Sequence, residues 1–283
     1  MRNTFYRKLK AMCLPAAVLL SGLLFFTGCK NKQSEETKAP ETVTETAEET
    51  VETEETDETE PALSKAGQEM RQFALPEEGE LCAEIVIENY GSIFVKLFER
   101  ECGRTVENFT TLAKQGYYDN MKVDRILNGY LFQTGNPNAD GGESIYGGGF
   151  KNEISDSLFP YRGALCMANM GEDGTNTSQF FFVQTTAETL SSIENPLDSR
   201  YRMDAIEYFE EAYGVTLSET QWELYKVYGG APEVQGFNTV FGQTYDGFEV
   251  IDAVCEAKVT SKLKPNPSIV ISTIRIFRFG EEE

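Results

Sequence analysis

The chain contains no histidine, and this absence restricts its chemistry more than any other feature. A catalytic triad that uses histidine as its base is excluded. Most zinc and copper sites lose their commonest ligand. The six cysteines occur without a single Cys-x-x-Cys spacing, so the thiolate form of a structural zinc site is not indicated either. We therefore expect a function that needs no metal and no other cofactor.

Basic residues are scarce, with 25 Lys and Arg against 46 Asp and Glu, which gives a net charge of -21. Nothing in the sequence resembles the basic stripe that binds phosphates, so nucleic acid is not expected as a partner. Much of the negative charge falls in residues 31–64, a low-complexity tract of Glu and Thr. Such a segment cannot bury enough apolar area to offset its ordering entropy. We expect residues 29–65 to form a disordered, self-repelling tether.

Long apolar runs are absent except near the N-terminus, at residues 11–27, which follow a stretch containing Lys and Arg. This run is too short to favour a permanent transmembrane helix and is typical of an export signal. The string Phe26-Thr27-Gly28-Cys29 resembles a bacterial lipobox, which implies a signal peptide over residues 1–28 and lipidation of Cys29. A plain cleaved signal and an uncleaved anchor are the alternatives. We expect an extracytoplasmic protein, attached to the bacterial cell membrane through its N-terminal lipid.

Residues 66–283 are long enough for one domain with a substantial core. The alternation of residues 81–98 predicts two strands around a turn at 88–91. Short apolar runs at 121–134, 163–169, 179–185 and 238–242 and an alternating segment at 269–279 predict further strands. Thr105 is expected to cap a helix that ends at Gly116, and a second helix is expected at 246–256. The cysteines at positions 82, 102, 166 and 255 are expected to be buried free thiols, although disulfides are possible in an exported protein.

The predicted fold is mainly β, a closed barrel capped by two helices. Residues 191–235 depart from this pattern because they read as helical. Gly214 is expected to end one helix, and Ser218-x-x-Gln221 is a capping box that begins the next. We interpret this segment as a helical insertion in a loop. It either contributes to binding or is a packing hairpin without a role in binding.

A candidate site comes from two short strings, Val123-Asp124-Arg125 and Gln179-Phe180-Phe181-Phe182. They could place an arginine, a glutamine and phenylalanine rings along one groove. We expect Phe180 and Phe182 to face the core and Phe181 to face the groove. An apolar groove with one fixed cation suits a mostly apolar ligand with one polar bond, such as an Xaa-Pro peptide bond. In the alternative interpretation, Arg125 is half of a surface ion pair with Asp124, which would contribute little.

The match to a known family is more extended than these two strings. It covers about residues 81–280 apart from the insertion, in the family's order and nearly its spacing. The residues that carry it are Asn108-Phe109, Gly116-Tyr117-Tyr118-Asp119, Arg125-Ile126, Gln133, Gly141-Gly142-Glu143-Ser144-Ile145-Tyr146-Gly147, Phe150, Glu153, Gly163, Met167-Ala168-Asn169, Ser178-Gln179-Phe180-Phe181, Val240-Phe241-Gly242 and Gly247-Phe248-Glu249-Val250. The chain resembles cyclophilins. The helical insertion before residues 236–242 resembles that of exported cyclophilin-type lipoproteins of Gram-positive bacteria.

The resemblance implies an eight-stranded barrel closed by two helices and peptidyl-prolyl cis/trans isomerase activity on proline-containing polypeptides, here exported client proteins. It implies that Arg125 is catalytic. It also implies that Gln133 orients Arg125 or binds the substrate backbone, although Gln133 could simply satisfy buried backbone groups. The substrate-binding residues that it implies are Tyr130, Leu131, Ala168, Asn169, Gln179, Phe181, Leu190 and Asn238.

The sequence departs from well-studied cyclophilins around the groove. Asp124 and Asn238 stand where the family has histidines, and Thr189 where it often has tryptophan. Tyr130 replaces a phenylalanine, and Leu131 stands where methionine is often found. We expect these changes to alter the substrate range and to weaken binding of cyclosporin-type ligands. They leave a second hypothesis open, in which the domain is a catalytically weak peptide-binding or chaperone module on the cell surface.

Overall fold

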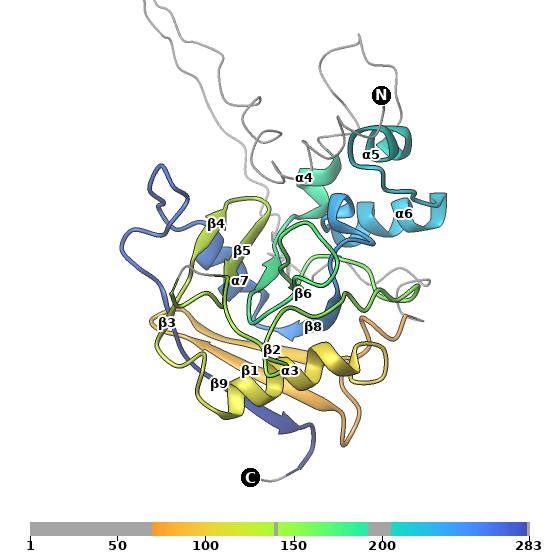
Figure 1. The fold of residues 1–283 in the computed structure, drawn as a ribbon. Helices are drawn as coiled ribbons and strands as arrows, with labels where there is room; N and C mark the ends of the chain where they lie inside the picture. Colours follow the sequence, from red (N-terminus) through yellow and green to blue (C-terminus); the bar gives the residue numbers. More distant parts are fainter. Residues whose placement is uncertain (1–69, 139–140, 192–204, 282–283) are drawn as a thin grey trace, which may run out of the picture. The chain divides into compact units, whose positions relative to one another are not determined.

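The computed structural model describes residues 70–138, 141–191 and 205–281 (Figure 1). All of them belong to one compact unit, Leu63–Glu283. The predicted signal peptide, Cys29 and the acidic tether lie outside the described residues. Within the described ranges, no helix is both long enough and apolar enough to cross a membrane.

The domain is built on one antiparallel sheet of nine strands. Their order in the sheet is β3-β9-β1-β2-β8-β6-β7-β5-β4. The strands are β1 (Leu81–Ile87), β2 (Gly91–Leu97), β3 (Met121–Lys122), β4 (Arg125–Leu127), β5 (Leu131–Thr134), β6 (Ala164–Met167), β7 (Phe180–Val183), β8 (Val240–Asp246) and β9 (Val270–Arg278). The predicted mainly β class is confirmed.

The strand count differs from the expected eight because residues 121–127 form two short strands with different partners. β3 pairs with β9, whereas β4 pairs with β5. Only Val123 and Asp124 separate these two strands, which are the two ends of the sheet order. Among the strands of the described chain, β3 and β4 are not paired with each other, so closure of the barrel stays a prediction.

Two helices pack on this sheet, α3 (Gly103–Lys114) against β9 and α7 (Phe248–Cys255) against β2, β4 and β5. The prediction that Thr105 caps the first helix was wrong, because α3 begins two residues earlier, after Cys102. The carboxylate of Glu153 accepts hydrogen bonds from the backbone N–H of Arg104 (3.1 Å) and of Thr105 (2.7 Å), and from the Thr105 hydroxyl (2.7 Å). A distant acidic side chain thus satisfies the helix N-terminus in place of a local cap.

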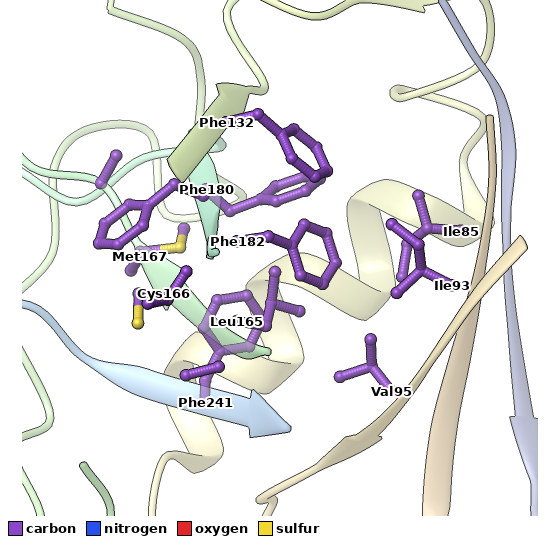
Figure 2. Packing of buried hydrophobic residues seen from close by; sticks show 14 of the residues in the cluster. Ile85, Ile93, Val95, Phe132, Leu165, Cys166, Met167, Phe180, Phe182 and Phe241 are labelled. Carbon is purple, nitrogen blue, oxygen red and sulfur yellow. The ribbon is translucent and has the colours of Figure 1, made fainter. Parts of the chain in front are cut away.

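The core lies between the sheet and α3, and aromatic rings from neighbouring strands fill it. Phe180 and Phe182 are fully buried, as predicted. Phe182 stacks on Phe132 with ring centroids 5.1 Å apart, and Phe180 meets Phe109 edge to face at 5.4 Å. Figure 2 shows Phe132, Phe180 and Phe182 in one cluster with aliphatic side chains of β1 and β2 such as Ile85 and Ile93. The four cysteines of the domain are free and buried, as expected, and burial raises the pKa of Cys102 to about 12.

The region predicted to be a helical insertion holds α5 (Ala205–Tyr213), α6 (Glu219–Tyr228) and the short 3-10 helix η2 (Pro232–Val234), preceded by α4 (Ala187–Ser191). The predicted capping box is confirmed: Ser218 Oγ accepts from the N–H of Gln221, and Gln221 Oε1 accepts from the N–H of Ser218. These helices have an apolar cluster of their own, formed by Tyr161, Leu190, Phe209, Val215, Leu217, Trp222, Leu224 and Tyr225. Residues 192–204 lie outside the described chain.

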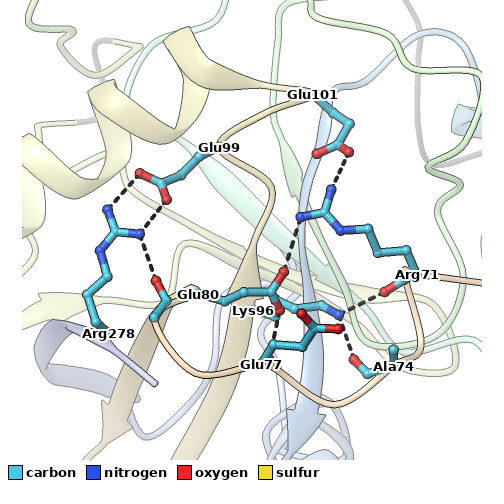
Figure 3. Close-up of polar contacts among 9 residues, drawn as sticks. Arg71, Ala74, Glu77, Glu80, Lys96, Glu99, Glu101 and Arg278 are labelled. Carbon is cyan, nitrogen blue, oxygen red and sulfur yellow. Dashed lines mark hydrogen bonds and ion pairs between the residues drawn. The ribbon is translucent and has the colours of Figure 1, made fainter. Parts of the chain in front are cut away.

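A polar cluster fixes the first described residues to the sheet (Figure 3). The side chain of Lys96 on β2 is only 2% exposed, and its ammonium donates to the carbonyl oxygens of Arg71 (2.8 Å) and Ala74 (2.6 Å). Burial lowers the pKa of Lys96. The Arg71 guanidinium in turn pairs with Glu80 at 3.1 Å and with Glu101 at 2.6 Å. The segment that enters the domain is therefore held by a buried cation, a contact that was not predicted.

Candidate active site

The strand register places the central candidate residues on one face of the sheet. Arg125 on β4 is opposite Gln133 on β5, and Gln133 is opposite Phe181 on β7. Directly opposed residues of antiparallel strands point to the same side. Their chain neighbours Phe132 and Phe182 point into the core. Phe181 is itself only 4% exposed and belongs to the same buried cluster, so its facing of the groove stays a prediction.

Hydrogen bonds link the polar members of this face into a relay. Arg125 Nη2 donates to Gln133 Oε1 at 2.9 Å, and Gln133 Nε2 donates to Gln179 Oε1 at 3.1 Å. The relay ends where Gln179 Nε2 donates to the carbonyl oxygen of Gly141 at 2.8 Å. Each amide accepts on one side and donates on the other, so the relay fixes the orientation of the guanidinium. Gln133 thus contacts Arg125, and its role in orienting Arg125 stays a prediction, whereas the contact with Gly141 was missed.

The alternative interpretation of Arg125 as partner of Asp124 is not supported. Asp124 Oδ2 instead accepts from the backbone N–H of Asn136 at 3.1 Å. Within the described residues, Arg125 makes its hydrogen bond to Gln133 and no ion pair, and its Nε is buried without a partner. Burial lowers the pKa of Arg125 and raises that of Asp124 to about 6. A guanidinium remains charged at neutral pH, so among the described residues the site holds a cation that is not in an ion pair.

Apolar side chains form the wall beside this cation. Phe181 is 4% exposed, Leu131 2% and Tyr130 6%. The Tyr130 hydroxyl is buried and has no hydrogen-bond partner among the described residues. Burial, and after it the nearby carboxyl of Glu233, raises the pKa of this hydroxyl. Glu233 belongs to η2, so the insertion brings an acidic group next to the site, which the sequence did not indicate.

The segment after β6 borders the same face. The N–H of Ala168 donates to the carbonyl oxygen of Gln179 at 2.9 Å. The side chain of Asn169 is occupied, since its Nδ2 donates to the carbonyl oxygen of Phe237 at 2.8 Å. Asn238 Nδ2 donates to the carbonyl oxygen of Met167 at 2.8 Å. In the part of the chain that is described, the backbone N–H and C=O of Asn169 have no partner and are available to a ligand.

Leu190 and the glycines at 141 and 142 differ in their position relative to the site. Leu190 is 2% exposed and belongs to the apolar cluster of the insertion rather than to the wall formed by Phe181. A place for Leu190 at the border of the site stays a prediction. The glycines at 141 and 142 lie beside the site, where the carbonyl oxygen of Gly141 accepts from Gln179. Gly142 has a φ of +78°, and a Cβ there would lie 2.3 Å from Ser178 Oγ, so this position requires glycine.

Comparison with known proteins agrees with this geometry. The model of the family described as cyclophilin type peptidyl-prolyl cis-trans isomerase/CLD matches residues 82–276, which is more than half of the 283 residues. The chain belongs to the cyclophilin family. It is thus a peptidyl-prolyl cis-trans isomerase, and the relay of Arg125, Gln133 and Gln179 lies within the matched region.

Individual cyclophilins support the same assignment. A protein of Staphylococcus aureus (strain USA300), provisionally named a peptidyl-prolyl cis-trans isomerase, is 37% identical over 190 residues, which are 66% of this chain and 88% of that protein. A Staphylococcus haemolyticus protein of the same name is also 37% identical over 190 residues, 87% of its length. The crystal structure of a Cryptosporidium parvum cyclophilin type isomerase superposes with a TM-score of 0.52 at 27% identity, covering 70% of this chain and 98% of that one.

Proposed function

We propose that this cyclophilin isomerises Xaa-Pro bonds of exported proteins and that Arg125 stabilises the twisted imide. Rotation about a peptide bond is slow because nitrogen donates its lone pair into the carbonyl, and the barrier is about 18–20 kcal/mol. In the twisted state the proline nitrogen becomes pyramidal and regains the lone pair. A donor aimed at this nitrogen binds the twisted state more strongly than the planar one and so accelerates rotation.

The observation that carries the proposal is the pairing of a fixed cation with an apolar wall. The hydrogen bond from Arg125 to Gln133 holds the guanidinium, and within the described residues no other hydrogen bond of its fork is formed. The reaction needs neither a nucleophile nor a proton transfer, so the replacement of two family histidines by Asp124 and Asn238 leaves this mechanism intact. A proline ring would lie against Phe181 and Leu131, which exclude water from the imide.

Substrate binding would use the free backbone groups of Asn169 as an anchor, in the manner of a short β pairing. Tyr130 and Asn238 would border the proline ring and its neighbours, and Gln179 would act through Gln133. The departures from the family at Tyr130 and Asn238 are the basis for expecting a changed substrate range and weaker binding of cyclosporin-type ligands. One related crystal structure, of the Cryptosporidium parvum protein, was obtained in the presence of the dipeptide Ala-Pro and superposes with a TM-score of 0.51 at 28% identity.

The place of action is proposed from the N-terminal sequence alone. An export signal over residues 1–28, a lipid on Cys29 and a repelling acidic tether over residues 29–65 would hold the isomerase domain away from an anionic membrane surface. Proteins that fold after export would then be the clients. Radiolabelled lipid incorporation tests this part of the proposal, because Cys29→Ser should abolish labelling while Cys13→Ser should not.

The catalytic proposal is tested by NMR exchange on an Ala-Pro peptide. Arg125→Ala should lower the enzyme-catalysed exchange rate by about 10²- to 10³-fold, the usual loss when one transition-state donor is removed. Arg100→Ala is the matched control, because Arg100 is exposed. Full exchange by Arg125→Ala would overturn the role of Arg125. Binding of the peptide by the wild type without exchange would instead favour the peptide-binding module.

A further inference from the structure

The insertion and the 154–160 loop enclose a groove of about 290 Å³ that Arg125 does not line. Its walls come from three separate parts of the chain. Ile154 and Asp156 belong to the loop, Gln221 lies in the first turn of α6, and Gln235 follows η2. Asn238, just before β8, also lines it. The groove therefore exists only because the insertion packs beside the loop.

This groove shares a residue with the candidate active site. Asn238 is a member of both, since it lines the groove and its Nδ2 donates to the carbonyl oxygen of Met167 at 2.8 Å. Met167 directly precedes Ala168 and Asn169, whose backbone borders the relay. A polypeptide with its proline against Phe181 can therefore extend past Asn238 into the groove.

The groups that line the groove suit a polypeptide backbone. Gln221 Oε1 already accepts from the N–H of Ser218 at 2.9 Å, and Gln235 Oε1 accepts from the Tyr225 hydroxyl at 2.9 Å. Among the described residues, neither amide Nε2 has a partner. Both side chains are thus left as donors, and backbone carbonyls are the acceptors that an extended peptide presents at regular intervals.

The charge and the apolar surface of the lining residues indicate which kind of peptide segment the groove would bind. Asp156 lines the groove, and no lysine or arginine is among its lining residues within the described chain. Ile154 is 47% exposed and offers an apolar contact at the rim. The protein's own acidic tether would be repelled by Asp156, whereas a segment with a basic side chain would be attracted.

We propose that this groove binds the residues that flank the proline in a longer substrate, with a preference for a basic residue. The inference rests on the proposed function and gives the insertion a role in substrate selection. Residues of the groove would then contribute to binding but not to the isomerisation step, so they should affect KM and leave kcat unchanged.

The test compares two substrates of the full chain: a four-residue Xaa-Pro peptide and a peptide extended on both sides that carries lysine. Ile154→Ser and Asp156→Lys should raise KM for the long peptide, by about tenfold if each removes about 1.4 kcal/mol of binding. KM for the short peptide and both kcat values should stay unchanged. Val227→Ser is the matched control, because Val227 on α6 is 36% exposed and does not line the groove.

If KM changed equally for both peptides, or for neither, the proposal that the groove binds the flanking residues would be wrong. Sedimentation of Ile154→Ser checks for another occupant: if the wild type is a dimer that this variant disrupts, the groove binds a second copy and the proposal is wrong. Failure of the groove and failure of the proposed function give different results with Arg125→Ala. This variant should lose turnover of both peptides but should still bind the long peptide more tightly than the short one. Calorimetric titration of Arg125→Ala with the two peptides measures this difference without any activity.

Discussion

Replacing Gln133 by alanine removes the centre of the relay while leaving the guanidinium in place. Two hydrogen bonds are lost, from Arg125 Nη2 at 2.9 Å and to Gln179 Oε1 at 3.1 Å. If Gln133 acts by fixing Arg125, the variant should still bind peptide. It should isomerise it more slowly, because the cation then samples orientations that do not face the proline nitrogen.

The size of the effect follows from the kind of bond removed. A hydrogen bond to a charged group contributes about 1.5–3 kcal/mol, and each 1.36 kcal/mol is tenfold in rate. Gln133→Ala should therefore lower kcat/KM by about 10- to 150-fold. Gln179→Ala removes two neutral bonds, one from Gln133 and one to Gly141, but only the first contacts Gln133. That bond contributes about 0.5–1.5 kcal/mol, so the loss in kcat/KM should be about 2- to 13-fold. The effect should decrease along the relay, from Arg125 through Gln133 to Gln179.

A protease-coupled assay on one Xaa-Pro peptide measures all three variants and the double variant Arg125→Ala/Gln133→Ala. If Gln133 works only through Arg125, the double variant should lose no more than Arg125→Ala alone. Independent, multiplicative losses would refute the reasoning and would point to direct contact between Gln133 and substrate. A larger loss for Gln179→Ala than for Gln133→Ala would also contradict it. Unchanged thermal unfolding is the control for folding.

Three further outcomes follow from groups around the site and the sheet. Burial raises the pKa of Asp124 to about 6, above its value in the unfolded chain, so the ionised carboxylate destabilises the fold. In urea unfolding, Asp124→Asn should therefore be more stable than the wild type at pH 8 and equal to it near pH 4. Lys96→Met leaves two backbone carbonyls without their donor, so hydrogen exchange at residues 70–75 should accelerate and unfolding free energy should fall by about 1–3 kcal/mol. Gly135 has a φ of +99°, and an added Cβ would lie 2.4 Å from the carbonyl oxygen of Ser178. In urea unfolding, Gly135→Ala should therefore lower the unfolding free energy by more than about 1 kcal/mol, and by more than Gly129→Ala, whose Cβ meets nothing within 4 Å.

Much of the fold could be predicted from local pattern. Alternation along the sequence was sufficient to assign Phe180 and Phe182 to the core, because strand geometry fixes the side on which each residue lies. The capping box at Ser218 and Gln221 was equally predictable, since both partners lie within one helical turn. The division of residues 121–127 between two partners was not, because pairing depends on distant strands.

The limits of prediction are clearest for polar groups whose partners are remote in sequence. Glu153 satisfies the start of α3 from about fifty residues away, which a search for a local cap at Thr105 cannot find. A lysine such as Lys96 is expected at the surface. It is nevertheless buried, and its ammonium donates to carbonyl oxygens near the start of the described chain. Glu233 likewise comes close to Tyr130 only through the folding of the insertion. In each case the sequence shows the group but not the contact.

The role of Arg125 is tested most directly by comparing the protein's affinity for a planar and a twisted ligand. Titration calorimetry would measure an Ala-Pro peptide and an analogue with a tetrahedral, twisted centre in place of the imide, with wild type and with Arg125→Ala. If the Arg125 guanidinium stabilises the twisted imide, the variant should lose about 10²- to 10³-fold in affinity for the analogue and little for the peptide. Equal losses for both ligands would show that Arg125 only holds the substrate, and the central claim would then be wrong.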